Sequence, residues 1–151
     1  MSTITPFLWF DDQAEEAMKF YVAIFKHSKV LSVAPGPAGK VMSATFELNG
    51  QEFMALNGGP MFSFTPAISL FVKCETQTEV DYYWEKLTAG GSEEPCGWLK
   101  DKYGLSWQVI PNALGEMLGN PDREKAGRAL QAMLQMKKIE IAALRAAFDG
   151  Q

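Results

Sequence analysis

The chain has 151 residues, which suits one domain and is long enough to bury a core without a disulfide or a structural metal. Hydrophobic residues make up 47% and charged residues 21%, a composition that excludes an intrinsically disordered chain. The net charge of −4 argues against a nucleic-acid partner, because phosphate contacts need clustered lysine and arginine. No apolar run approaches the ~20 residues that span a bilayer, and the N-terminus lacks the basic start of a secretion signal. We therefore expect a cytoplasmic protein with no membrane partner.

The first half of the chain predicts a strand, a helix and three further strands. The helix is expected to have Asp12 as its N-cap, with Glu15 reaching back to it. Asn49-Gly50 is a favoured two-residue hairpin turn between the last two strands. The strands are expected at residues 3–10, 29–34, 40–48 and 51–57, with a loop at 35–39.

The second half predicts the same order of elements. A strand at 67–73 precedes a helix that begins near Thr76, with Glu79 three residues later, and ends at Gly90-Gly91. Strands are expected around 93–101 and 105–111, and Asp101 is expected to cap the turn that joins them. Asn120 and Pro121 then predict the start of a helical tail, with a possible break near 138–140.

The two halves are an internal repeat. Thr5-Pro6 corresponds to Thr65-Pro66, and the Gly50 turn corresponds to the Gly104 turn. We predict one α+β domain over residues 1–151, with a first βαβββ unit at 3–58, a second at 64–112 and a helical tail at 120–149. Neither unit can bury its sheet alone, so the two should pair into one curved mixed sheet with a concave pocket.

This arrangement resembles the vicinal oxygen chelate superfamily, which includes glyoxalase I, bleomycin-resistance proteins and extradiol dioxygenases. The chain is more specifically similar to the PhnB-like group, whose domain is called 3-demethylubiquinone-9 3-methyltransferase. The segments that carry the resemblance are WFDDQAEEAMKFYVAIF (9–25), FTPAISLFVKCETQTEVDYYWEKL (64–87), CGWLKDKYGLSWQVIP (96–111) and QAMLQMKKIEIAAL (131–144).

The resemblance implies a place for a divalent metal, because enzymes of the superfamily hold one on the first and last strands of each unit. Those positions fall near Pro6, Met54, Ala67 and Gln108. Only Gln108 offers a hard donor atom of the kind that zinc, iron or manganese takes. His27, at the end of the first predicted helix, is expected to be a solvated cation. We therefore predict no metal and no cofactor.

Methyl transfer has little support in the residues. An S-adenosylmethionine site of the Rossmann type needs a glycine-rich turn after the first strand. Here that turn is Phe10-Asp11-Asp12-Gln13, without glycine. The leading hypothesis is a small-molecule-binding protein. The alternative is an enzyme of the same superfamily, either a metal-dependent lyase or dioxygenase or a methyltransferase-like protein, and a third possibility is an interaction module whose aromatic residues fill its own pocket.

Aromatic and amide side chains are expected to line the pocket and to bind an apolar or aromatic ligand. The expected pocket residues are Phe7, Trp9, Met54, Asn57, Phe62, Phe64, Trp98, Trp107 and Gln108, with Asn57 and Gln108 as the polar anchors. The tail carries more apolar residues than one packing face needs, which predicts a homodimer. Those residues are Leu130, Met133, Leu134, Met136, Ile139, Ile141 and Leu144.

Overall fold

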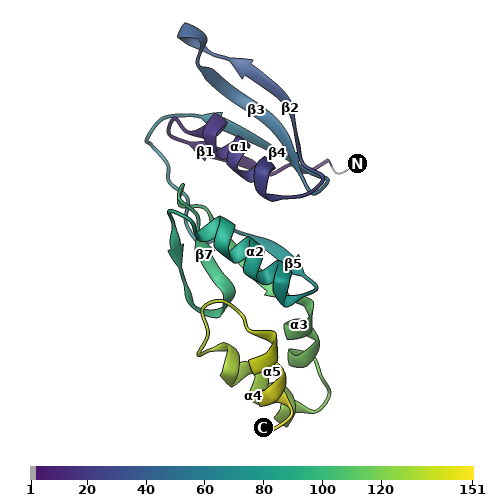
Figure 1. Ribbon diagram of the computed structural model, residues 1–151. Coiled ribbons are helices and arrows are strands. Elements are labelled where there is room, and N and C mark those ends of the chain that lie inside the picture. Colours follow the sequence, from purple (N-terminus) through teal and green to yellow (C-terminus); the bar gives the residue numbers. More distant parts are fainter. Residues whose placement is uncertain (1–2) are drawn as a thin grey trace. The chain divides into compact units, whose positions relative to one another are not determined.

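The computed structural model describes residues 3–151 and divides into two compact units, the first ending at Phe64 and the second spanning Thr65–Gln151 (Figure 1). Each unit has one four-stranded mixed sheet and repeats the strand-helix-three-strand order. The predicted α+β class with an internal repeat is therefore confirmed. The pairing of the units into one curved sheet, and their description as a single domain, stay predictions.

The first unit is a sheet with one helix against it. Its elements are β1 (Phe7–Phe10), α1 (Ala14–Ile24), β2 (Lys29–Pro35), the short helix η1 (Pro37–Gly39), β3 (Val41–Leu48) and β4 (Gln51–Asn57). The strand order is β1-β4-β3-β2, with β1 parallel to β4 and the other pairs antiparallel. Because side chains alternate along a strand, one face of this sheet is buried under α1. Its buried residues are Leu8, Phe10, Ala44, Phe46, Leu48, Phe53 and Ala55.

The start of α1 differs from the prediction. The helix begins at Ala14, and its N-cap residue Gln13 makes no capping hydrogen bond with its side chain. The Ala14 N–H instead donates to Oδ1 of Asn57 at 2.8 Å, across the unit from β4. Asp12 is therefore not the N-cap, because a side chain distant in sequence supplies the acceptor that a helix start needs.

The second unit repeats this layout. It contains β5 (Ser69–Cys74), α2 (Gln77–Thr88), β6 (Ser92–Glu93), the short helix η2 (Pro95–Gly97), β7 (Trp98–Lys100) and β8 (Ser106–Pro111). The strand order is β5-β8-β7-β6, with β5 parallel to β8. Thr76 caps α2 as predicted, because its Oγ1 accepts the N–H of Glu79 at 3.2 Å.

Three helices follow β8, where the sequence predicted a tail that starts at Asn120. They are α3 (Asn112–Leu118), α4 (Arg123–Met133) and α5 (Ile141–Phe148). The first of them was not predicted. The N-cap of α4 is Asp122, whose Oδ1 accepts the N–H groups of Glu124 and Lys125, so the predicted cap at Asn120 is two residues early. The predicted break is confirmed, because residues 134–140 separate α4 from α5.

The tail buries much of its own apolar surface. Ile139 and Leu144 are fully buried in a core with Ile110, Leu114 and Met117. Met133 and Met136 pack against this core, while Leu130 and Leu134 stay exposed at 39% and 48%. Fewer apolar residues than the sequence suggested are therefore left for a partner.

Candidate ligand-binding site

Each sheet has a second face that points away from α1 or α2, which we call its far face. On the far face of the first sheet, β1 contributes Phe7 and Trp9, which lie opposite Met54 and Leu56 of β4. Phe7 is 53% exposed, although it is a large aromatic residue. Three of the predicted pocket residues, Phe7, Trp9 and Met54, are thus brought together on one apolar surface.

The chain that follows β4 folds against Trp9. The Trp9 Nε1–H donates to the carbonyl oxygen of Gly59 at 2.9 Å, and the Phe62 ring meets the indole edge-to-face with centroids 4.9 Å apart. A Cβ on Gly58 would lie 2.4 Å from the indole, so the indole requires glycine there. Phe64 packs edge-to-face on Phe10, at a centroid distance of 5.3 Å. Of the aromatic residues predicted for the pocket, Phe62 therefore packs on Trp9, while Phe64 packs on Phe10.

Asn57 is occupied by the fold. Its Oδ1 accepts the Ala14 N–H at 2.8 Å, and its Nδ2 donates to the carbonyl oxygen of Val41 at 2.9 Å. These bonds tie the end of β4 to the start of α1 and to β3. We therefore place Asn57 outside the candidate site, as a support for it.

The far face of the second sheet carries polar groups between aromatic ones. Phe71 on β5, Gln108 on β8 and Trp98 on β7 lie side by side in one row across the sheet. Phe71 is 53% exposed, like Phe7 in the first unit. Gln108 Nε2 donates to Ser69 Oγ at 3.0 Å, which holds the amide on this face.

The neighbouring rows of this face add two cations and two hydroxyl groups. Lys73 follows Phe71 on β5, and Lys100 follows Trp98 on β7, each two residues further along its strand. Ser106 lies opposite Ser69 and Lys100. It is fully buried, and its Oγ has no hydrogen-bond partner within residues 3–151.

Trp107 belongs to the core. It points to the α2 side of the sheet and is only 2% exposed. Its Nε1–H donates to Oδ2 of Asp101 at 2.8 Å, while Oδ1 of the same carboxylate accepts the N–H groups of Tyr103 and Leu105. The predicted turn-capping role of Asp101 is confirmed, and Trp107, which the sequence assigned to the pocket, is a structural residue.

The repeat explains why sequence reasoning missed Phe71 and both lysines. Counted from the Gly50 and Gly104 turns, Met54 corresponds to Gln108, so their parallel partners Phe7 and Phe71 also correspond. Pro6 directly precedes Phe7, whereas four residues separate Pro66 from Phe71. Aligning the two Thr-Pro pairs therefore hid the equivalence of Phe7 and Phe71. The alternation of side chains within residues 67–73 (AISLFVK) could have suggested it.

The protein chain offers few groups for metal or nucleophilic chemistry. Within residues 3–151, no three His, Cys, Asp or Glu side chains form a cluster that could hold a metal ion. His27 is exposed, and its backbone adopts a left-handed conformation with φ of 54°. Burial, followed by the charge of Glu79, raises the pKa of the Cys74 thiol to about 12, which keeps this thiol protonated and unreactive at neutral pH.

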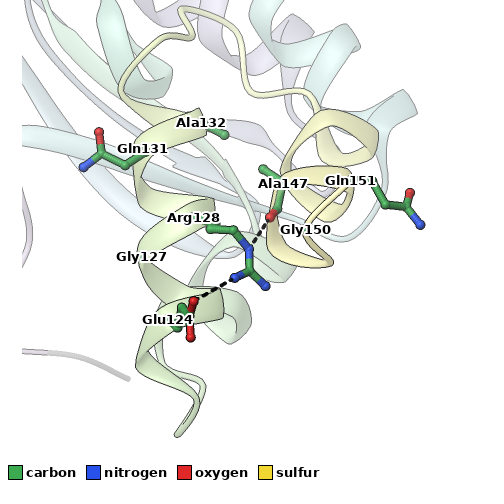
Figure 2. A pocket seen from close by; sticks show the side chains of 8 residues that line it. All are labelled: Glu124, Gly127, Arg128, Gln131, Ala132, Ala147, Gly150 and Gln151. Atoms are coloured by element: carbon green, nitrogen blue, oxygen red, sulfur yellow. Dashed lines mark hydrogen bonds and ion pairs between the residues drawn. The ribbon is translucent and has the colours of Figure 1, made fainter.

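A groove of about 700 Å³ lies elsewhere, between α4 and α5 (Figure 2). Arg128 is one of its lining residues. Its Nε donates to the carbonyl oxygen of Ala147 at 2.9 Å, and its Nη2 donates to that of Phe148 at 2.8 Å. Its Nη1 lies 3.9 Å from a carboxylate oxygen of Glu124. A cation near the last carbonyls of a helix stabilises the helix end. Arg128 therefore has a structural role, which is to attach the end of α5 to α4.

The fold defined by these two units is that of the glyoxalase, bleomycin-resistance and dioxygenase superfamily, in which several solved structures are similar to this chain. The fosfomycin resistance protein FosX of Listeria monocytogenes, solved with Mn(II) and sulfate, is 17% identical, with a TM-score of 0.55 over 70% of this chain and 88% of its own. Protein PA1353 of Pseudomonas aeruginosa is 20% identical, with a TM-score of 0.63 over 74% of this chain and 98% of its own.

A nearer likeness defines the family. Residues 2–110 match the family described as 3-demethylubiquinone-9 3-methyltransferase. The PhnB protein of Bacillus cereus, which carries the same family description, is 41% identical, with a TM-score of 0.67 over 73% of this chain and 99% of its own. This chain therefore belongs to the PhnB-like 3-demethylubiquinone-9 3-methyltransferase family. The family match ends within β8, before the three C-terminal helices. A comparison with curated proteins finds no match.

Proposed function

We propose that this chain binds a small apolar or aromatic molecule against the far faces of its sheets. The observation that carries the proposal is the pair Phe7 and Phe71, which occupy equivalent positions and are each 53% exposed. Both residues lie on the edge strands β1 and β5, and large aromatic side chains that stay exposed are typical of surfaces that bury a ligand or a partner. Gln108 supports the proposal as a polar anchor, because its amide is held in place by Ser69.

Ligand binding is tested by tryptophan fluorescence against a panel of aromatic metabolites. We expect saturable quenching in the wild type and a loss of affinity in Phe71→Ser and Phe7→Ser. Val33→Ser is the matched control, because Val33 is an exposed apolar residue on the edge strand β2. If no member of the panel binds, or if all three variants bind as the wild type does, the proposal fails.

We further propose that binding needs no metal. The equivalent far-face pairs of the two units hold Phe7 with Met54 and Phe71 with Gln108, and three of these side chains lack a donor that manganese, zinc or iron prefers. Native mass spectrometry of the purified protein tests this. The proposal is overturned by one tightly held transition metal per chain that is lost in Gln108→Ala.

The family description favours methyl transfer as a second candidate. A methyltransferase would have to bind S-adenosylmethionine, yet the first N–H of α1 is taken by Asn57, and no glycine precedes that helix in the turn after β1. Isothermal titration with S-adenosylmethionine distinguishes the candidates. Stoichiometric binding would establish the second candidate in place of the first.

We also propose that the protein is a cytoplasmic homodimer. The exposed side chains of Leu130 on α4 and of Leu134, directly after that helix, support self-association, since they leave apolar surface uncovered. Among the described residues, no helix has the length and apolar character that crossing a membrane requires. Light scattering after size-exclusion chromatography tests the assembly, and a monomer at micromolar concentration would reject it.

A further inference from the structure

The second sheet carries two lysines whose ammonium groups form no ion pair within the described part of the chain. Lys73 is exposed and Lys100 half-buried, and neither forms an ion pair with another residue of 3–151. The acidic residue nearest to Lys100 across the ladder, Glu93 on β6, points to the opposite face, where it accepts the indole N–H of Trp84. Both cations are therefore available to an external anion.

The strand register places Gln108 between the two lysines. Lys73 lies opposite Ile110, two residues beyond Gln108 on β8, and Lys100 lies opposite Ser106, two residues before it. Diagonal neighbours at this spacing are within reach of long side chains. The bond from Gln108 to Ser69, itself a diagonal neighbour, shows that such contacts form on this face.

Ser106 gives a second and independent observation. Its hydroxyl is fully buried on the same face, in the same row as Lys100, and has no hydrogen-bond partner among residues 3–151. A buried hydroxyl without a partner is unfavourable unless something supplies one. The hydroxyl marks this row of the face as polar, and because it is fully buried, the groups that an external anion can reach are Lys73, Lys100 and the Gln108 amide.

The first unit shows that this charge is not a property of the fold. At the positions equivalent to Lys73 and Lys100, counted from the same strand pairs, the first sheet has Trp9 and Glu47. The position equivalent to Ser106 is Glu52, which lies opposite Glu47. The same architecture therefore presents cations and a hydroxyl in one unit and an indole and acids in the other.

We propose that the far face of the second sheet is a subsite for an anionic aromatic molecule, whose ring packs on Phe71 and Trp98 and whose carboxylate, sulfonate or phosphate group is held by Lys73, Lys100 and the Gln108 amide. This inference rests on the proposed function and specifies the class of ligand. Charge-assisted hydrogen bonds to an anion are stronger than neutral ones, so the charged group contributes much of the affinity.

A pair of dyes with the same aromatic skeleton tests the subsite. The anionic probe is 1-anilinonaphthalene-8-sulfonate, and the neutral probe is N-phenyl-1-naphthylamine. We expect Lys73→Met/Lys100→Met to weaken binding of the anionic dye about tenfold, the effect of losing charge-assisted bonds, while the neutral dye keeps its affinity. Raising the salt concentration should weaken only the anionic dye, and only in protein that keeps both lysines.

The control is Lys26→Met/Lys86→Met, which removes the same charge from exposed positions on other surfaces. If the anionic dye binds both double variants equally, the anionic subsite is rejected while the proposed function stands. If Phe71→Ser weakens neither dye, the far face of the second sheet is not a binding surface, and the proposed function fails there as well. Urea unfolding of each variant confirms that the fold is kept.

Discussion

Phe7 and Phe71 occupy equivalent positions in the two units, but their surroundings differ. Phe7 lies beside Met54 and two residues before Trp9, whose indole donates to the Gly59 carbonyl and contacts Phe62. Phe71 lies beside Gln108, on the same face as Lys73 and Lys100, which form no ion pair with residues 3–151. One repeated βαβββ arrangement therefore supports a far face with aromatic and acidic side chains in the first unit and one with aromatic and cationic side chains in the second. The core residues under the helices maintain the arrangement, so the far faces were free to diverge.

The hairpin turns of the two units also differ, in their length and in the groups that hold them. In the first unit, Asn49 and Gly50 turn the chain with positive φ angles of 49° and 83°. The second unit uses a longer turn, in which the buried carboxylate of Asp101 binds two backbone N–H groups and the Trp107 indole. The short turn combines this backbone conformation with one side-chain bond, from the Asn49 N–H to Ser28 Oγ at 3.1 Å, whereas the longer turn depends on one carboxylate that accepts three hydrogen bonds. The second unit should therefore be more sensitive to single substitutions.

The largest predicted effect is that of Asp101→Ala. It leaves three donors without their acceptor, of which the Leu105 N–H and the Trp107 indole N–H are buried, so we expect the free energy of unfolding to fall by about 3 kcal/mol. Urea denaturation followed by circular dichroism measures this. Asp101→Asn keeps one acceptor oxygen and should cost less. An Asp101→Ala protein as stable as the wild type would contradict the difference drawn between the two turns.

Gly58→Ala tests the packing that is specific to the first unit. The added Cβ would come within 2.4 Å of the Trp9 indole, so the ring must leave its place beside Gly59 and Phe62. We expect a loss of about 2 kcal/mol, as is usual for overpacking, together with a changed Trp9 emission spectrum. Gly127→Ala is the control, since its Cβ meets nothing within 4 Å and alanine favours the helix. Equal stability of both variants would show that Trp9 is not held as described.

Gln108→Met makes the second far face resemble the first at its central position. The loss of the bond to Ser69 should lower the free energy of unfolding by only about 1 kcal/mol, the net value of one hydrogen bond. The affinity for an anionic aromatic dye should fall as well. Met54→Gln, the reciprocal change, should not confer such affinity, because that face lacks the two lysines. If Met54→Gln bound the anionic dye as strongly as the wild type does, the contrast between the faces would be wrong.

The smallest effect concerns an attachment that only the second unit has. Lys138 Nζ lies 2.8 Å from Oδ1 of Asp81 and links the segment after α4 to α2. The hydrogen bond from Lys138 lowers the pKa of Asp81, and the hydrogen bond to Asp81 raises the pKa of Lys138. Both groups are partly exposed, so Asp81→Asn should cost only about 0.5 kcal/mol at neutral pH.

The pH dependence of this pair follows from the two directions. The contribution of Asp81 to the free energy of unfolding is present above its unfolded pKa of about 3.9. It is lost as the pH falls through the lowered pKa of the folded state. The contribution of Lys138 is present below its unfolded pKa of about 10.4 and is lost as the pH rises through the raised folded value. The stability difference between Asp81→Asn and the wild type should therefore disappear near pH 2. A difference that persists there would assign the effect to packing rather than to charge.

Local signals in the sequence were enough to predict several elements. Alternation predicted the strand at 40–48, the Asn49-Gly50 pair predicted the hairpin turn, and Thr76 with Glu79 predicted the start of α2. The repeat of these signals gave the two βαβββ units and the resemblance to the PhnB-like family. Each of these features depends on residues that are close in sequence, so the sequence alone is enough to predict it.

Which side chains are available at the far faces depends on contacts between residues that are distant in sequence. Asn57 and Trp107 were predicted to contact a ligand, but a helix N-terminus and a buried carboxylate already bind them. Phe71 and Lys73 were not singled out, because their importance comes from the parallel pairing of β5 with β8. Hydrogen bonds and strand pairs between residues distant in sequence follow from register and burial, which local patterns do not specify.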